Sequence, residues 1–200
     1  IIAPCDSHDM KYLMKESTKI KGPLYVRIAR GGEDIISSRY KPKIGKAIEF
    51  KKSNKCYFVT TGITSHIAIK ASHILQEKHN IDCGVIHFST IKPLDKIALK
   101  RIMNKVNKVI TVEENVKSGG FGSSVLELAS EIKSNIKIKI VGLEDKFINK
   151  WKRIIIDECH DIINKIDLGK WNHNQSVGGL SPSFATKNTI KSIVYIIITY

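Results

Sequence analysis

The stretch Val109–Ser123, with the sequence VITVEENVKSGGFGS, decides the fold because signals for a strand, a loop and a helix follow one another in it. The run from Val109 to Val112 is β-branched and apolar, which is typical of a buried strand. Two carboxylates and an asparagine end this run, and a loop with three glycines leads to a helical pattern that begins at Ser123. This order predicts one βα unit of an open parallel sheet, in which ligands bind beyond the carboxyl ends of the strands.

The same alternation of strands and helices extends on both sides of this unit. Further strands are predicted over residues 24–29, 56–61, 83–88 and 136–141, with a short edge strand at 45–50. Helices are predicted after the capping residue Asp6, over residues 67–75, 96–105 and 123–132, and over 154–166. Such alternation predicts an α/β fold with a doubly wound, mostly parallel sheet.

The chain divides into three parts by this pattern. Residues 1–32 form a βαβ piece that is too small to be a domain, and the first part of the chain ends at residue 40. We therefore expect the sheet of this piece to be completed by residues outside this chain or by another chain. Residues 41–168 form a second domain, and residues 169–200 form a poorly specified tail rich in Asn, Ser, Gly and Pro. Because the sequence starts with Ile1 in what looks like a strand end, we expect that it is cut from a longer protein.

Composition narrows the class of partner. The 33 Lys and Arg residues against 19 Asp and Glu give a net charge of +14. The lysines are scattered and form no basic stripe with aromatic residues, so we expect a solvated surface and no nucleic-acid partner. No apolar run reaches the length of about 18 residues that a transmembrane helix needs, so we expect no membrane partner.

Cysteines and histidines show no spacing typical of a metal site. The four cysteines are far apart, without a CxxC motif, and predict reduced thiols in a cytoplasmic protein. We interpret the seven histidines, at positions 8, 66, 73, 79, 87, 160 and 173, as surface or packing residues.

Three features at predicted strand ends are candidate sites. Arg30 follows an apolar strand beside two glycines and either binds a phosphate or forms a surface salt bridge. Glu113 and Glu114 are adjacent and therefore point apart, which favours a loop-anchoring role for one of them over a shared acid–base site. The glycine loop at 119–122 lacks both a P-loop and a dinucleotide fingerprint, which favours a structural role over phosphate binding.

Several motifs in a consistent order resemble the carboxyl-terminal part of the transketolase superfamily of thiamine-diphosphate enzymes. These motifs are Ala3-Pro4-Cys5-Asp6, the run from Gly22 to Gly31, Thr60-Thr61-Gly62, Thr90-Ile91-Lys92-Pro93-Leu94-Asp95, and Val109–Ser123, followed by Gly142, Asp145 and Phe147. Within the superfamily, the chain is most similar to transketolase carboxyl-terminal sections and to the carboxyl-terminal part of 1-deoxy-xylulose-5-phosphate synthase.

The resemblance implies an architecture and a role. Residues 1–40 would be the last βαβ of a pyrimidine-binding domain, and the domain that follows would resemble the transketolase carboxyl-terminal domain. The complete enzyme would transfer a two-carbon ketol unit between sugar phosphates, as a homodimer or as a heterotetramer with an amino-terminal section that is either fused or separate. Thiamine diphosphate and Mg²⁺ would have their ligands outside this chain, which would be inactive alone. Arg30 matches a position that contacts the substrate phosphate in related enzymes.

Two alternatives remain open at this point. The complete enzyme would instead join pyruvate to glyceraldehyde 3-phosphate if the similarity to the deoxyxylulose-phosphate synthase is the closer one. A chain that only docks a partner subunit would resemble the carboxyl-terminal domain of the 2-oxo-acid dehydrogenase β subunit.

Overall fold

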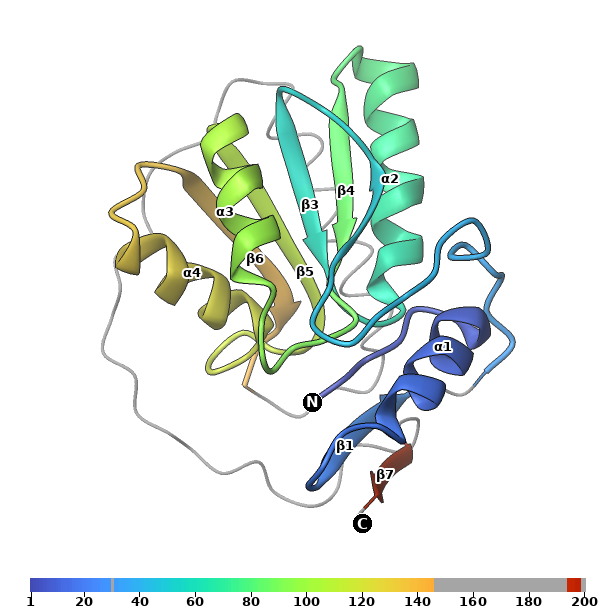
Figure 1. The fold of residues 1–200 in the computed structure, drawn as a ribbon. Helices are drawn as coiled ribbons and strands as arrows, with labels where there is room; N and C mark the ends of the chain where they lie inside the picture. Colours follow the sequence, from blue (N-terminus) through green and yellow to red (C-terminus); the bar gives the residue numbers. More distant parts are fainter. Residues whose placement is uncertain (30, 146–193, 199–200) are drawn as a thin grey trace.

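A five-stranded mixed sheet forms the centre of the molecule in the computed structural model, which describes residues 1–29, 31–145 and 194–198 (Figure 1). The strands lie in the order β2-β4-β3-β5-β6, and only the edge strand β2 is antiparallel to its neighbour. Their bounds are β2 Ile48–Lys51, β3 Cys56–Thr60, β4 Cys83–His87, β5 Lys108–Val116 and β6 Lys137–Leu143. The predicted mostly parallel α/β sheet, including the short edge strand, is confirmed.

Helices cover both faces of this sheet, as a doubly wound fold requires (Figure 1). Helix α2 (Thr64–His79) packs on one face, where Phe58 and Leu75 are fully buried in one core cluster. Helices α3 (Lys96–Lys105) and α4 (Phe121–Glu131) pack on the other face against alternate strand residues such as Val59. None of the described helices combines the length and the apolar composition that crossing a membrane requires.

Residues 1–44 form a second, smaller part that lies beyond the carboxyl ends of the central strands (Figure 1). It contains helix α1 (Ser7–Ser17), capped by the Asp6 side chain, and strand β1 (Leu24–Ile28). The sequence predicted a strand end at residues 1–4. The structure has only two isolated β-bridges there, from Ile2 to Val26 and from Ile2 to Thr90.

The other edge of β1 differs from the expectation. We expected residues outside this chain, or another chain, to complete the sheet, whereas β1 pairs antiparallel with β7 (Val194–Ile198) of the same chain. The predicted helix at 154–166 and most of the 169–200 tail lie outside the described residues. The domain boundaries at residues 40 and 168 remain predictions.

The strand β5 is longer than its sequence suggested. The sequence placed its end at Val112, before the two carboxylates, whereas the structure continues it to Val116 with an irregular register after Val112. Both carboxylates have partners inside the fold, the α4 amides for Glu113 and Arg27 for Glu114, so both can be buried within the strand. For a related reason α4 begins at Phe121 and not at the predicted Ser123, because Glu113 binds its first amide groups.

Candidate functional site at the junction of the two parts

The carboxyl ends of β3, β4 and β5 face the amino-terminal part (Figure 1). Polar side chains from both parts, among them Asp9, His87 and Glu114, are buried. Backbone hydrogen bonds join the two parts directly: the Ala3 amide donates to the Ser89 carbonyl at 2.7 Å, and the Gly62 amide donates to the Ala3 carbonyl at 3.1 Å. The edge of the sheet that the sequence predicts to be functional is therefore covered, in this chain, by its own first residues.

A buried ion pair crosses this junction. Arg27 on β1 places its Nε 3.0 Å from Oε1 of Glu114 on β5, and both side chains are less than a tenth exposed. The Arg27 Nε–H and Nη2 make no aligned hydrogen bond among the described residues, so charge attraction holds the pair. Burial raises the pKa of Glu114, and the Arg27 guanidinium opposes that shift. The pair therefore depends on both partners remaining present.

Gly62 gives this ion pair its space. A Cβ at Gly62 would lie 2.9 Å from Oε1 of Glu114 and 3.1 Å from Nη2 of Arg27. Its φ of +61° is also in the left-handed region, which favours glycine. The glycine of the Thr60-Thr61-Gly62 motif is thus explained by the close approach of a charged pair to the backbone.

Glu113 anchors the glycine loop. Its Oε2 accepts a hydrogen bond from the Phe121 amide at 2.7 Å, and its Oε1 accepts one from the Gly122 amide at 2.8 Å. These donors form the amino terminus of α4, the position where a phosphate would bind. A carboxylate of the protein already occupies it, so the predicted loop-anchoring role is confirmed and the phosphate-binding alternative is disfavoured.

Glu113 makes the stability of the fold depend on pH. Burial raises its pKa from an ordinary value of 4.5 to about 7, against the opposing effect of its two amide donors and of Arg27. The native state then binds a proton between pH 4.5 and 7 that the unfolded state releases, so stability is highest below this window and falls as pH rises through it. We expect a loss on the order of 2–3 kcal/mol between pH 4.5 and 7 in urea unfolding. Glu113→Gln should flatten this slope, and equal slopes in both proteins would contradict the assignment.

Gly120 is required by the same contact. An added Cβ would collide with Oε2 of Glu113 and with the Val116 carbonyl oxygen. We expect Gly120→Ala to lower the free energy of unfolding by about 2–3 kcal/mol in urea titrations, through overpacking and a displaced carboxylate. Gly119→Ala is the matched control, because Gly119 has open space around it and only its φ of +68° resists a side chain. Its expected cost is about 1 kcal/mol, and an equal cost at both positions would refute the role of Glu113.

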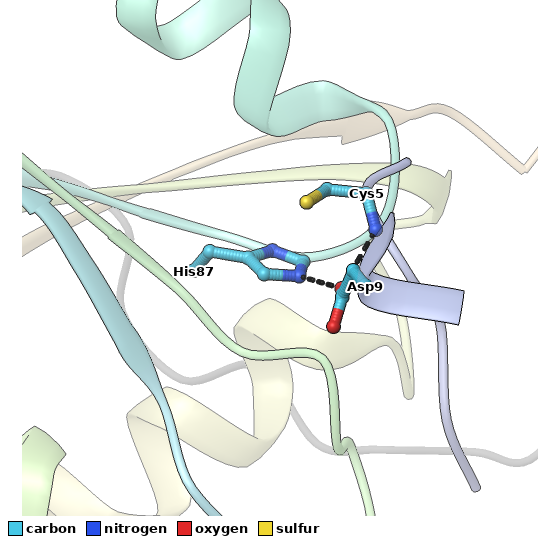
Figure 2. A group of neighbouring side chains, drawn as sticks. All are labelled: Cys5, Asp9 and His87. Atoms are coloured by element: carbon cyan, nitrogen blue, oxygen red, sulfur yellow. Dashed lines mark hydrogen bonds and ion pairs between the residues drawn. The ribbon is translucent and has the colours of Figure 1, made fainter. Parts of the chain in front are cut away.

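A second set of buried groups joins α1 to β4. Oδ2 of Asp9 lies 3.0 Å from Nε2 of His87 and accepts a hydrogen bond from the Cys5 amide at 3.0 Å (Figure 2). The Ser89 hydroxyl donates to the same carboxylate at 3.0 Å. The other ring nitrogen of His87, Nδ1, lies 2.8 Å from the Ser65 hydroxyl oxygen. Asp9 and His87 are fully buried, so this network fixes the amino-terminal part against the sheet.

Two kinds of chemistry fit these residue types, and the structure disfavours both. Ser65, His87 and Asp9 stand in the order of a hydrolase triad, but all three are fully buried and no substrate reaches them. Cys5, Asp9 and His87 each offer one metal-ligand atom within 4.8 Å of the others (Figure 2). Burial, followed by the nearby Asp9, raises the pKa of Cys5, which keeps its thiol protonated and opposes metal binding.

The sequence did not reveal this network. We interpreted the histidines as surface or packing residues, whereas His87 is buried and hydrogen-bonded, and His66 on α2 makes a 2.9 Å contact through Nε2 with the Cys5 carbonyl. One signal was present, because a histidine inside the apolar run 83–88 needs a buried partner. Its partner Asp9 is 78 positions away, beyond the reach of any spacing rule.

Arg30, the predicted phosphate ligand, lies outside the described residues. The segment that follows it is held by Asp6, whose carboxylate accepts hydrogen bonds from the Ile36 and Ser37 amides, each at 2.8 Å. Asp6 also caps α1. Its carboxylate therefore holds the segment at Ile36 and Ser37 close to the start of α1, beside the junction. The role of Arg30 remains a prediction.

The junction does not form a site for a diphosphate cofactor in the described residues. The amino terminus of α4 is taken by Glu113, and the buried space beside Gly62 is taken by Arg27 and Glu114. The described residues of this chain therefore do not fit thiamine diphosphate.

Known proteins are similar to this chain in both sequence and fold. Residues 45–154 match the family model described as the transketolase carboxyl-terminal domain. The chain belongs to this family. The match covers the central sheet from β2 onward, which includes the glycine loop and both glutamates.

Individual relatives are similar to this chain over a larger share of its length than the family model is. The 1-deoxy-D-xylulose-5-phosphate synthase of Clostridium perfringens is 36% identical over 159 residues, which are 78% of this chain and 26% of that protein. The synthase of Desulforudis audaxviator is 30% identical over 156 residues, or 74% of this chain and 24% of that protein. The chain thus spans about a quarter of the length of these curated relatives.

A solved structure shows the same arrangement. The chain described as a split-gene transketolase in an inactive β4 tetramer has a TM-score of 0.75 and 25% identity to this chain. The likeness covers 84% of this chain and 57% of that one. This share of the chain is larger than residues 45–154, which the family model matches, so the structural likeness also includes residues outside that range.

Proposed function

We propose that this chain is the carboxyl-terminal section of a thiamine-diphosphate-dependent enzyme of the transketolase superfamily, and that it acts together with an amino-terminal section. The observation that carries the proposal is the buried junction. The Arg27–Glu114 pair and the Asp9–His87 contact fix a segment that resembles the end of a pyrimidine-binding domain onto the family's carboxyl-terminal domain. A rigid joint of this kind suits a domain that positions its neighbour.

The cofactor ligands belong to the amino-terminal section in this proposal. Thiamine diphosphate supplies the carbon–carbon chemistry when it is bound, together with Mg²⁺, between domains of the complete enzyme. This chain contributes subunit packing and, through Arg30, one contact to the substrate phosphate. The amino-terminal section is fused or separate, and the assembly is a homodimer or a heterotetramer. The described cysteines Cys5, Cys56 and Cys83 are unpaired, which supports a cytoplasmic location.

Two reactions are candidates for the complete assembly. Transfer of a two-carbon ketol unit between sugar phosphates is supported by the likeness to the split-gene transketolase, at 25% identity. Joining pyruvate to glyceraldehyde 3-phosphate is supported by the synthases, at up to 36% identity. The higher identity favours the second reaction.

A substrate panel separates the two reactions. The chain is co-expressed with the coding region immediately upstream, and the purified assembly is given pyruvate with glyceraldehyde 3-phosphate, or a ketose phosphate with an aldose phosphate. Carbon dioxide release in the first mixture supports the synthase, and ketol transfer in the second supports a transketolase. A complex that forms but turns over neither mixture favours a docking domain without a direct catalytic role.

Arg30→Ala in this assembly tests the phosphate contact. A charge-assisted contact of about 1.5–3 kcal/mol corresponds to a fall in kcat/KM of roughly 10- to 150-fold. We expect this fall with the phosphorylated substrate and a much smaller one with its unphosphorylated analogue. Arg39→Ala is the matched control, because Arg39 is exposed and lies outside the junction. An equal fall in kcat/KM for both substrates would show that Arg30 does not contact the substrate phosphate.

A further inference from the structure

Two cysteines meet at the edge of the sheet opposite the junction. Cys56 opens β3, Cys83 opens β4, and the two residues are direct partners in the parallel register. Both side chains belong to the core cluster beneath α2, so they point to the same face of the sheet. Neighbouring strands lie about 4.8 Å apart, which is within the Cα separation that a disulfide spans.

The two thiols have different surroundings. A hydrogen bond with the Cys83 thiol lowers the pKa of Cys56, and Lys108 and Lys51 act in the same direction against burial and Asp82. Burial raises the pKa of Cys83, and the adjacent Cys56 adds to that shift. This asymmetry makes Cys56 the better nucleophile and leaves Cys83 as a protonated neighbour.

Cys56 also lines a cavity. This cavity, of about 320 Å³, is lined by Cys56, Asp82 and Lys108, together with Lys55 and Ile81, whereas Cys83 is not among its lining residues and is fully buried. The cavity is large enough for a small molecule, and its two lysines outnumber Asp82, so its charged lining residues carry a net positive charge. A cysteine that lines such a cavity, beside a second and fully buried cysteine, is the arrangement of a reactive and a resolving cysteine.

We propose that Cys56 and Cys83 form an oxidisable dithiol, in which Cys56 reacts with a hydroperoxide in the cavity and Cys83 resolves the product as a disulfide. In the first step the Cys56 thiolate attacks the peroxide, its sulfur is oxidised to a sulfenic acid, and the O–O bond breaks to release an alcohol, or water when the oxidant is hydrogen peroxide. In the second step the Cys83 sulfur attacks the Cys56 sulfur, the disulfide forms, and the sulfenic hydroxyl leaves as water with the Cys83 proton.

The competing interpretation is that both thiols are inert packing groups, as buried cysteines usually are. Cys5 serves as an internal reference for that behaviour, because it is fully buried and burial raises the pKa of its thiol. The proposal requires Cys56 to react well before Cys5 does. Inert packing predicts that neither reacts while the chain is folded.

Mass spectrometry of the folded full chain treated with hydrogen peroxide tests the proposal. We expect a Cys56–Cys83 disulfide, with the loss of two hydrogens per chain, to form at least about tenfold faster than any oxidation of Cys5. In Cys83→Ser, dimedone should trap a sulfenic acid on Cys56. In Cys56→Ser, Cys83 should remain unlabelled. Cys5→Ser is the matched control and should form the disulfide at the wild-type rate.

Alanine versions of both cysteine variants, checked by circular dichroism, separate reactivity from loss of fold. If a serine variant unfolds, the alanine variant supplies the same measurement with an apolar side chain in the core. A folded wild-type chain that forms no Cys56–Cys83 disulfide, or in which Cys5 oxidises as fast as Cys56, would overturn the proposal. Dimedone labelling of Cys83 in the Cys56 variants would reverse the assigned roles and overturn it equally.

Discussion

Replacing Arg27 by methionine is expected to lower the free energy of unfolding by about 3–5 kcal/mol, measured by urea titration. The substitution leaves the Glu114 carboxylate buried at the junction without its counter-charge, and breaking a buried pair from one side has an effect of this size. Glu114 is 7% exposed, so solvent does not compensate for the lost guanidinium. The loss reports on the contact between β1 and β5, which is the contact that joins the two parts of the chain.

The double variant Arg27→Met with Glu114→Gln tests the cause of that loss. Removing the stranded charge should recover at least about 1 kcal/mol relative to Arg27→Met alone, because the amide has a lower cost of burial than the carboxylate. A double variant that is less stable than the single one would show that Arg27 acts by packing its side chain and not by charge.

Replacing Asp9 by alanine is expected to have a similarly large effect, with a loss of about 3–5 kcal/mol in the same urea titration. The change leaves three buried donors without their acceptor: the Cys5 amide, the His87 ring nitrogen Nε2 and the Ser89 hydroxyl. Each stranded donor costs about 1–3 kcal/mol, and the sum is reduced by local relaxation.

Two further variants calibrate the Asp9 result. Asp9→Asn keeps one acceptor oxygen and should lose roughly half as much as Asp9→Ala. Asp34→Ala removes an exposed carboxylate and should change stability by less than about 0.5 kcal/mol. If Asp9→Ala matched Asp34→Ala, the network of Asp9, His87 and Ser89 would contribute nothing to the joint.

The fold follows from local patterns in the sequence to a large extent. The apolar runs 56–61 and 83–88 predicted β3 and β4, and the predicted helix 96–105 agrees with α3, which the structure shows to be capped by the Asp95 side chain. These elements are specified by residues near one another in the chain. The extension of β5 through Glu113 and Glu114 is not, because it depends on Arg27 from another part of the chain and on the amides of α4.

The candidate site was less accessible to sequence reasoning for the same physical reason. A loop-anchoring role could be predicted for one of Glu113 and Glu114, because the amide donors that Glu113 binds lie only eight and nine positions away. The partnership of Asp9 with His87 depends on the way the two parts dock, and no local period encodes it. The pairing of β1 with β7 likewise joins segments at opposite ends of the sequence.

We propose that this chain completes a thiamine-diphosphate enzyme whose cofactor ligands lie in an amino-terminal section. Thiamine-diphosphate-dependent turnover should be measured for three preparations: this chain alone, the product of the coding region immediately upstream, and the two co-expressed. We expect turnover only in the co-expressed complex. Turnover by this chain alone would contradict the placement of the cofactor site, and equal turnover by the upstream product without this chain would contradict its role in the enzyme.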